Sequence, residues 1–174
     1  MPDSGTISAK FKDHIATITF HHPKGNSLPG RMLRGLAETI EEQGQKKEIN
    51  VIVIQSGGDG AFCAGASFDE LMGISSYEEG KRFFMGFALV INAMRTCPKL
   101  IIARIQGKSV GGGVGIAAAA DHTLAHRSAD VKLSELALGI GPFVVGPAVR
   151  RKMGDAAFST LTIDATNWYD ADWA

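Results

Sequence analysis

The chain has 174 residues, and its 18 lysines and arginines balance its 18 aspartates and glutamates, so its formal net charge at pH 7 is zero. This length suits one domain with its own core, and we predict a single domain over residues 1–174. The charge balance argues against nucleic acid or an anionic membrane surface as the partner, which leaves a small molecule or another protein.

The two cysteines, Cys63 and Cys97, are too few for a disulfide framework, and we expect free thiols in a reducing compartment. Residues 1–14 contain no apolar stretch of the kind that a secretory signal needs. The longest apolar runs fall far short of the roughly 20 residues of a membrane helix. The sequence therefore predicts a cytoplasmic protein without a membrane span.

The first elements should be a pair of strands followed by a helix. Residues 6–11 and 15–22 alternate or are rich in β-branched side chains, and the turn-like residues 12–14 between them predict a hairpin. A loop of proline, glycine and asparagine over residues 22–30 then leads into a predicted helix over 31–45. The apolar face of this helix should consist of Met32, Leu33, Leu36 and Ile40.

Strands and helices alternate along the following residues. Residues 49–58 form an apolar run that ends in glycines, which is typical of a strand buried on both faces. Helices are predicted over 68–73 and 78–95, and a strand over 100–107. This alternation favours the α/β class, with parallel strands joined by crossover helices. The final residues, 167–174, are expected to lie in a helix.

The stretch Ser109–His122, SVGGGVGIAAAADH, is unusually bare of side chains. It follows the strand over 100–107 and should contain a turn and the start of a helix. Such a helix start offers unpaired N–H groups and the positive end of a dipole, so it suits a dinucleotide, a nucleotide phosphate or an oxyanion. The alternative is that its glycines and alanines allow a neighbouring element to pack closely.

The dinucleotide interpretation has limited support. Gly113, Gly115 and Ala118 satisfy the pattern G-x-G-x-x-A, and Glu135 follows about twenty residues later. However, two short candidate strands, rather than one, lie between the helix and this acid. The triplet Gly107–Ser109 precedes the other glycines, which excludes a P-loop. On this stretch alone, close packing is favoured.

A second stretch, Ala61–Glu70 (AFCAGASFDE), also leads from a buried strand through a turn of small residues into a short helix. Two such turns side by side would present two main-chain N–H groups to one oxygen. Preorganised donors of this kind stabilise a developing oxyanion, and the loss of one typically costs on the order of 10² to 10³ in rate. The two turns together therefore predict an oxyanion site.

Three motifs carry a resemblance to a known family: AFCAGASFDEL from Ala61, QGKSVGGGVGIAAAADHTLA from Gln106 and LSELALGIGPFVVGPAVRRKMG from Leu133. In this order and spacing they resemble the enoyl-CoA hydratase/isomerase family of the crotonase superfamily, and the similarity covers nearly the whole chain. The resemblance implies a crotonase-like fold, in which β-β-α units form a superhelix with parallel sheets and crossover helices. It also implies assembly as a homotrimer or as a hexamer made of two trimers.

The same resemblance implies a site for an acyl-CoA thioester, whose carbonyl oxygen would lie between two backbone amides. Carried onto this sequence, those amides belong to Ala66 and Gly112. Coenzyme A enters as part of the substrate, and no other cofactor and no metal is implied. Residues expected to contact the substrate are Lys24, Ala64, Ser67, Phe68, Gly111 and Pro142.

The acid–base groups depart from the hydratase pattern. Hydratases of the family carry two glutamates; the second matches Glu135, whereas Gly115 stands at the position of the first. One carboxylate suits the transfer of a proton from C2 to C4 of a 3-enoyl-CoA, so Δ3,Δ2-enoyl-CoA isomerase activity is slightly preferred. The alternatives are a hydratase with a substitute acid and a non-catalytic acyl-CoA-binding or oligomerisation module. The structural alternative for Glu135 is that it is simply an exposed residue at a strand end.

Several other side chains have both functional and structural interpretations. Asp69 and Glu70 are either substitute carboxylates or favourable first-turn charges of a helix. Asp121 and His122 are expected to have a structural role, and Cys63 should be a buried small residue rather than a nucleophile.

Two further groups and the end of the chain leave alternatives open. The loop that holds His21, His22 and Lys24 either approaches the phosphates of coenzyme A or is solvated. Family chains normally run on well beyond the last residue here, so we expect the family's C-terminal helical region to be missing. The chain is then a fragment of a longer enzyme, which we favour, a short member that is covered by a neighbouring subunit, or a remnant without activity. Residues that either cover the acyl chain or pack in the core are Phe83, Phe84, Phe87 and Leu89.

Overall fold

The computed structural model describes residues 5–174; residues 1–4, part of the N-terminal stretch in which no secretory signal is expected, lie outside the described residues. β1 (Thr6–Lys12) and β2 (Ile15–His21) form an antiparallel pair. The tight turn between them places Asp13 and His14 at positive φ. The predicted hairpin is therefore confirmed.

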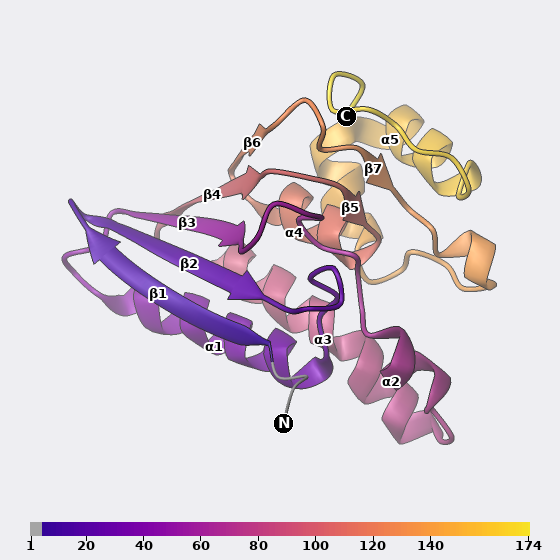
Figure 1. Ribbon diagram of the computed structural model, residues 1–174, viewed down its shortest axis with the longest axis horizontal. Helices are drawn as coiled ribbons and strands as arrows, with labels where there is room; N and C mark the ends of the chain where they lie inside the picture. The colour runs from indigo at the N-terminus through magenta and orange to yellow at the C-terminus, as the bar shows by residue number, and fades with distance from the viewer. Residues whose placement is uncertain (1–4) are drawn as a thin grey trace.

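The hairpin begins a five-stranded sheet with the order β1-β2-β3-β4-β6. β3 (Val51–Ser56), β4 (Leu100–Ile105) and β6 (His122–Ala125) all run parallel to β2. Helices connect β2 to β3 and β3 to β4 (Figure 1). The α/β class with parallel strands and crossover helices is therefore confirmed.

Two long helices, α1 (Gly30–Gln45) and α3 (Tyr77–Thr96), lie along one face of this sheet (Figure 1). The predicted apolar face of α1 is buried in the core. The prediction that β3 is buried on both faces is wrong. Its alternate residues Ile52 and Ile54 are fully buried, whereas Val51 and Val53 are only half-buried because their side chains point to the opposite face of the sheet.

After β4 the chain builds a smaller unit that holds the glycine-rich stretch. β5 (Ser109–Val110) pairs in parallel with β7 (Val131–Lys132), and α4 (Gly112–Ala119) begins immediately after β5. The short helix α2 (Phe68–Met72) follows the Ala61–Glu70 stretch. These elements provide two strand–turn–helix units, with one difference from the prediction. The strand that leads into α4 is β5, which lies within the turn expected after β4 and pairs with β7.

The last helix, α5 (Gly146–Ile163), follows a 3-10 turn at Leu136–Leu138 and changes direction at Gly154, where φ is 81°. The sequence patterns did not predict α5. Its packing against α4 closes the core at the yellow end of the chain in Figure 1. In the part of the chain that the structure describes, no helix combines the length and the apolarity that a membrane crossing requires.

The expectation of a helix over residues 167–174 is wrong. α5 ends at Ile163, and the residues that follow form turns and one isolated bridge. In that bridge Tyr169 exchanges two backbone hydrogen bonds with Val131, at 2.8 and 3.0 Å. The final segment is extended there because it pairs with β7, and a helix cannot make these bonds.

Candidate active site

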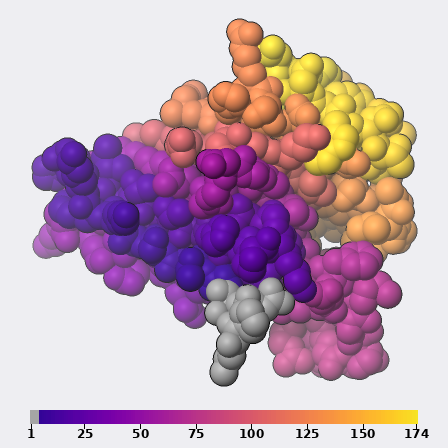
Figure 2. Space-filling model, in the orientation of Figure 1, coloured from indigo at the N-terminus to yellow at the C-terminus, as the bar shows by residue number. Residues whose placement is uncertain are grey.

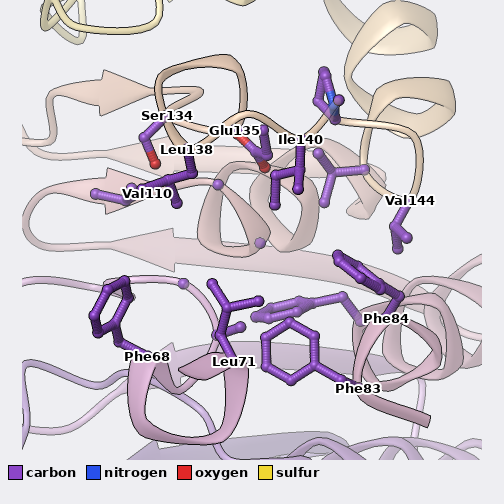
Figure 3. A pocket seen from close by; sticks show the side chains of 18 of the residues that line it. Phe68, Leu71, Phe83, Phe84, Val110, Ser134, Glu135, Leu138, Ile140 and Val144 are labelled. Atoms are coloured by element: carbon purple, nitrogen blue, oxygen red, sulfur yellow. The ribbon is translucent and has the colours of Figure 1, made fainter. Parts of the chain in front are cut away.

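A cavity of about 260 Å³ lies between α2 and α3 on one side and residues 134–145 on the other. Figure 2 shows a hollow here, between the magenta lobe of α2 and α3 and the orange segment after β7. Among the described residues that line the cavity, only Ser134 and Glu135 have polar side chains. The apolar side chains around it include Phe68, Leu71, Phe83, Phe84, Leu138 and Ile140 (Figure 3).

The glycines of α4 are required by close packing. A Cβ atom at Gly112 would overlap the ring of Phe87 on α3. A Cβ atom at Gly115 would lie 2.6 Å from Cγ1 of Val145, next to the start of α5. Protein interiors are packed too densely for such contacts to be relieved without a shift of the neighbour. The close-packing interpretation of this stretch is therefore confirmed.

The fold excludes the dinucleotide interpretation. β5 pairs with β7 in a two-stranded sheet, whereas dinucleotides bind at the carboxyl edge of a large open parallel sheet. The backbone at Gly113 approaches protein rather than leaving room for a pyrophosphate, because a Cβ atom there would lie 2.6 Å from the carbonyl oxygen of Cys63.

The backbone at Ala66 is held by Leu28. The Leu28 amide donates to the Gly65 carbonyl at 2.8 Å, and the Ser67 amide donates to the Leu28 carbonyl at 3.3 Å. Because successive peptide groups of an extended segment alternate in direction, the amide of Ala66 points away from Leu28. Ala66 lines the cavity, and among the described residues its amide has no hydrogen-bond acceptor.

Gly112 also lines the cavity, as the first residue of α4, where a helix leaves its N–H groups without partners. Within residues 5–174 its amide donates to no protein acceptor. Gly111 makes the turn from β5 into α4 with φ 51° and ψ −110°, a conformation that favours glycine. A Cβ atom at Gly65 would lie 4.0 Å from the Gly112 nitrogen, so the backbone that leads into Ala66 lies against the start of α4.

Glu135 lies just before the 3-10 turn, and Figure 3 shows its carboxylate directed toward the cavity. A Cβ atom at Gly111 would lie 3.0 Å from Glu135 Oε1, so the carboxylate is close to the start of α4. Glu135 Oε2 is buried and has no hydrogen-bond partner among the described residues. Burial raises the pKa of this carboxyl, and its own backbone amide offsets part of the effect. The alternative interpretation, in which Glu135 is an exposed residue at a strand end, is therefore wrong.

The cavity brings together most of the residues predicted to form the site. Ser67 is not on its wall; its hydroxyl caps α2 by accepting a hydrogen bond from the Glu70 amide at 3.3 Å. Lys24 is not on the wall either, and its ammonium lies 2.6 Å from Asp69 Oδ2. The predicted residues on the wall are Ala64, Ala66, Phe68, Gly111, Gly112, Glu135 and Pro142.

Neither Asp69 nor Glu70 stands in for the carboxylate that is missing at Gly115. Neither side chain lines the cavity. Hydrogen bonding to Lys24 lowers the pKa of Asp69, and Glu70 Oε2 accepts a hydrogen bond from the Gly30 amide at 2.8 Å. Both carboxylates lie in the first turn of α2, as the structural interpretation expects.

The other candidates have structural surroundings. Burial raises the pKa of the Cys63 thiol to about 12, so the reactive thiolate is scarce at neutral pH. Asp121 Oδ2 accepts a hydrogen bond from a β4 amide at 2.8 Å, while His122 is exposed at the start of β6. His22 is buried, and its ring accepts a hydrogen bond from the amide two residues further on.

The apolar residues of α3 that were expected to cover the acyl chain or pack in the core divide between the cavity and the surface. Phe83, Phe84 and Phe87 line the cavity, whereas Leu89 does not and is 40% exposed. Sequence reasoning missed most of the opposite wall because it lies in a loop without periodicity. Its nearness to Glu135 in the third motif is the signal that points to it. The missed residues there are Ser134, Leu138, Ile140, Gly141, Val144 and Val145.

Comparisons with known proteins identify the family. Residues 10–172 match the family described as Enoyl-CoA hydratase/isomerase. The chain is 30% identical over 164 residues to the bacillaene synthase dehydratase PksH of Bacillus subtilis (strain 168), which covers 91% of this chain and 61% of that protein. It is 36% identical over 117 residues to the mitochondrial methylglutaconyl-CoA hydratase of Homo sapiens, and this aligned region covers 67% of this chain and 34% of that protein. The chain thus spans only part of the length of these relatives.

Solved structures give the same result for the fold. The chain superposes on an enoyl-CoA hydratase of Mycobacterium smegmatis with a TM-score of 0.89 and 25% identity, covering 95% of this chain and 65% of that one. The DspI protein of Pseudomonas aeruginosa also gives a TM-score of 0.89, with 26% identity and coverage of 99% and 65%. The chain therefore has the crotonase fold and belongs to the enoyl-CoA hydratase/isomerase family.

Proposed function

We propose that this chain carries the catalytic site of an enoyl-CoA isomerase, which moves the double bond of a 3-enoyl-CoA thioester from C3–C4 to C2–C3. The observation that carries the proposal is the half-buried carboxylate of Glu135, whose Oε2 atom is buried without a hydrogen-bond partner among the described residues. Among the described residues that line the cavity, Glu135 is the only acid or base, and it lies beside the start of α4. Family membership and the name of the human relative support a coenzyme A thioester as the substrate.

The proposed reaction uses the two amides and the carboxylate in sequence. The thioester oxygen accepts hydrogen bonds from the Ala66 and Gly112 amides. The Glu135 carboxylate takes a proton from C2, and the electrons of that C–H bond form a dienolate whose negative charge rests on the thioester oxygen. Glu135, now protonated, returns the proton to C4, so that the double bond lies between C2 and C3 and the carboxylate is regenerated.

The surroundings of Glu135 suit this task. A base that must remove a weakly acidic proton is more effective when its pKa is raised toward the working pH, and burial raises the pKa of this carboxyl. The electrostatic effect of the helix dipole and of the two amides is largest in a cavity that excludes water, and the cavity wall is mainly aliphatic and aromatic.

The position of Gly115 favours isomerisation over hydration. Addition of water needs one group to activate the water and another to deliver a proton, and the first glutamate of the hydratase pattern has no counterpart on the cavity wall among the described residues. The apolar lining also indicates an uncharged hydrocarbon acyl group. Assembly as a homotrimer or hexamer stays a prediction from the resemblance.

The proposal is tested by assaying wild-type protein and Glu135→Gln with trans-3-hexenoyl-CoA and with crotonyl-CoA. We expect the wild type to convert the first substrate into its 2-enoyl isomer without hydrating the second. We expect Glu135→Gln to lose about 10²- to 10⁴-fold of the isomerase rate while it still binds the thioester. Glu41→Gln, at an exposed position on α1, is the matched control and should keep full activity.

Hydration of crotonyl-CoA by the wild type would contradict the isomerase proposal. Binding of either thioester without any turnover would instead support a non-catalytic binding module. Equal activities of the Glu135→Gln and Glu41→Gln variants would remove Glu135 from the mechanism.

A further inference from the structure

The space that a side chain at position 115 would need is filled by two apolar residues. A Cβ atom at Gly115 would lie 2.6 Å from Val145 Cγ1, 2.9 Å from Val145 Cβ and 3.2 Å from Ile91 Cδ1. These three distances are all shorter than ordinary carbon contacts. Replacing the family's first glutamate by glycine has therefore not left a void in which a water molecule replaces the carboxylate.

Val145 stands between Gly115 and the cavity. Val145 lines the cavity, whereas Gly115 does not. Any group that extended from position 115 toward the substrate would have to displace the Val145 side chain. The wall of the cavity that would receive the first glutamate is thus a hydrocarbon surface.

The position of Val145 is fixed by the start of α5. Its carbonyl accepts hydrogen bonds from the amides of Ala148 and Val149, both at 3.1 Å, and the next amide, that of Gly146, donates to the Pro142 carbonyl at 2.7 Å. Val145 is only 3% exposed. A valine also has few rotamers to choose from, so the side chain cannot swing away easily.

We propose that Val145 is a specificity-determining residue that keeps water away from the reacting double bond and so commits Glu135 to returning its proton to the substrate. This inference rests on the proposed isomerase function. Water addition would put oxygen on C3 and hydrogen on C2, and the incoming water needs polar partners that hold it against the acyl chain. Val145, the residue that forms this part of the cavity wall, offers none.

Two substitutions at Val145 separate polarity from space. Val145→Thr keeps nearly the same shape and adds a hydroxyl that can hold a water molecule, and Val145→Ala opens space instead. Val149→Thr is the matched control, because Val149 is also buried on α5 but does not line the cavity. Thermal melting of each variant establishes that it is folded before its activity is compared.

The assay follows trans-3-hexenoyl-CoA in D₂O and measures both the hydrated product and the deuterium in the isomer. Wild type and Val149→Thr should give the isomer with little deuterium and no hydrated product. Val145→Thr should raise the deuterium content of the isomer about tenfold or more and should also form hydrated product. If Val145→Ala does not fold, Val145→Thr alone decides the result.

A second pair of variants tests the space at position 115 directly. Gly115→Glu alone should destabilise the protein and should not hydrate crotonyl-CoA, because its side chain has no path to the cavity. Gly115→Glu combined with Val145→Gly should allow hydration. Hydration by the single variant would overturn the assigned role of Val145.

The two levels of the proposal fail differently. If the wild type does not isomerise the substrate, the proposed function fails. If the wild type isomerises it but Val145→Thr matches Val149→Thr in both deuterium content and hydrated product, the role of Val145 fails and the isomerase proposal stands.

Discussion

The backbone turns that lead into α4 and α2 each bring an amide to the cavity, yet the two helices are held in different ways. All residues of α4 except Ala117 are buried, and a side chain at Gly112, Gly113 or Gly115 would meet a neighbouring element. α2 has no buried residue. It is fixed by polar contacts: the Ser67 cap, the bond from the Gly30 amide to Glu70, and the pair of Lys24 and Asp69.

The difference indicates that the Gly112 amide is positioned by dense packing. The Ala66 amide is positioned by backbone hydrogen bonds to Leu28, and only the helix that follows it depends on weaker surface interactions. Packing contacts change steeply with distance, so the Gly112 turn should not tolerate substitution. Exposed polar contacts contribute little individually, so the α2 turn should tolerate change.

The largest effect is expected for Gly112→Ala. Its methyl group would overlap the Phe87 ring, which should destabilise the protein by about 1–3 kcal/mol. Displacement of the amide should also lower the isomerase rate by on the order of 10² to 10³. Gly60→Ala is the control, since a Cβ atom there would meet nothing within 4 Å. Thermal unfolding and turnover are the measurements, and equal results for the two variants would refute the packing account.

The next effect is a pH dependence set by Glu135. Because burial raises the pKa of its carboxyl, kcat/KM should fall on acidification at a higher pH than an ordinary glutamate would give. The folded protein holds this proton more tightly than the unfolded chain, so stability should decline as pH rises from the ordinary pKa of glutamate through the raised value.

The Glu135→Gln variant checks both parts of this prediction. It removes the buried charge, so it should melt at a higher temperature than the wild type at neutral pH, and the difference should vanish in acid. A pH–rate profile of the wild type and paired melting curves at several pH values are the measurements. A variant that melts below the wild type at neutral pH would contradict the prediction, because it would mean that the charged carboxylate stabilises the folded protein.

A smaller effect is expected for Ser67→Ala. Loss of the cap should weaken α2 by about 0.5–1 kcal/mol and raise KM slightly, while kcat changes little. Ser76→Ala serves as the control, because it removes the equivalent cap of α3. The Ser76 hydroxyl accepts a hydrogen bond from the Glu79 amide at 3.3 Å. Hydrogen exchange of the α2 amides and Michaelis kinetics distinguish the two. A large fall in kcat for Ser67→Ala would show that the position of α2 tolerates as little change as that of α4.

The smallest effect is expected for Asp69→Asn. The pair with Lys24 is exposed on both sides, so the melting temperature should not change. If Lys24 approaches the phosphates of coenzyme A, loss of the neighbouring negative charge should lower KM, and added salt should screen the change. A rise in KM would show instead that the ion pair between Lys24 and Asp69 helps the substrate to bind.

Much of the fold could be predicted because its elements carry strong local signals. The hairpin, α1 and the parallel strands follow from period-two and helical patterns, and the apolar face of α1 is buried as expected. The burial of β3 and the conformation after Ile163 could not be predicted, since they depend on which face the helices cover and on pairing of Tyr169 with Val131. These contacts join residues far apart in the sequence.

The site divides in the same way. Glu135 and the two turns are recognisable because they belong to motifs with fixed spacing. The outward position of Lys24 depends on its partner Asp69, and the blocking of position 115 depends on Val145, which lies thirty residues further along the chain. No local pattern records such contacts, so only the folded structure reveals that the glycine at 115 is packed rather than vacant.

The most direct test of the account is a crystal structure of the Glu135→Gln variant with trans-3-hexenoyl-CoA bound. If the proposed oxyanion site is right, the thioester oxygen lies about 2.7–3.1 Å from the amide nitrogens of both Ala66 and Gly112, and C2 faces residue 135. A thioester oxygen that bonds to neither amide, or a C2 atom turned away from residue 135, would contradict it.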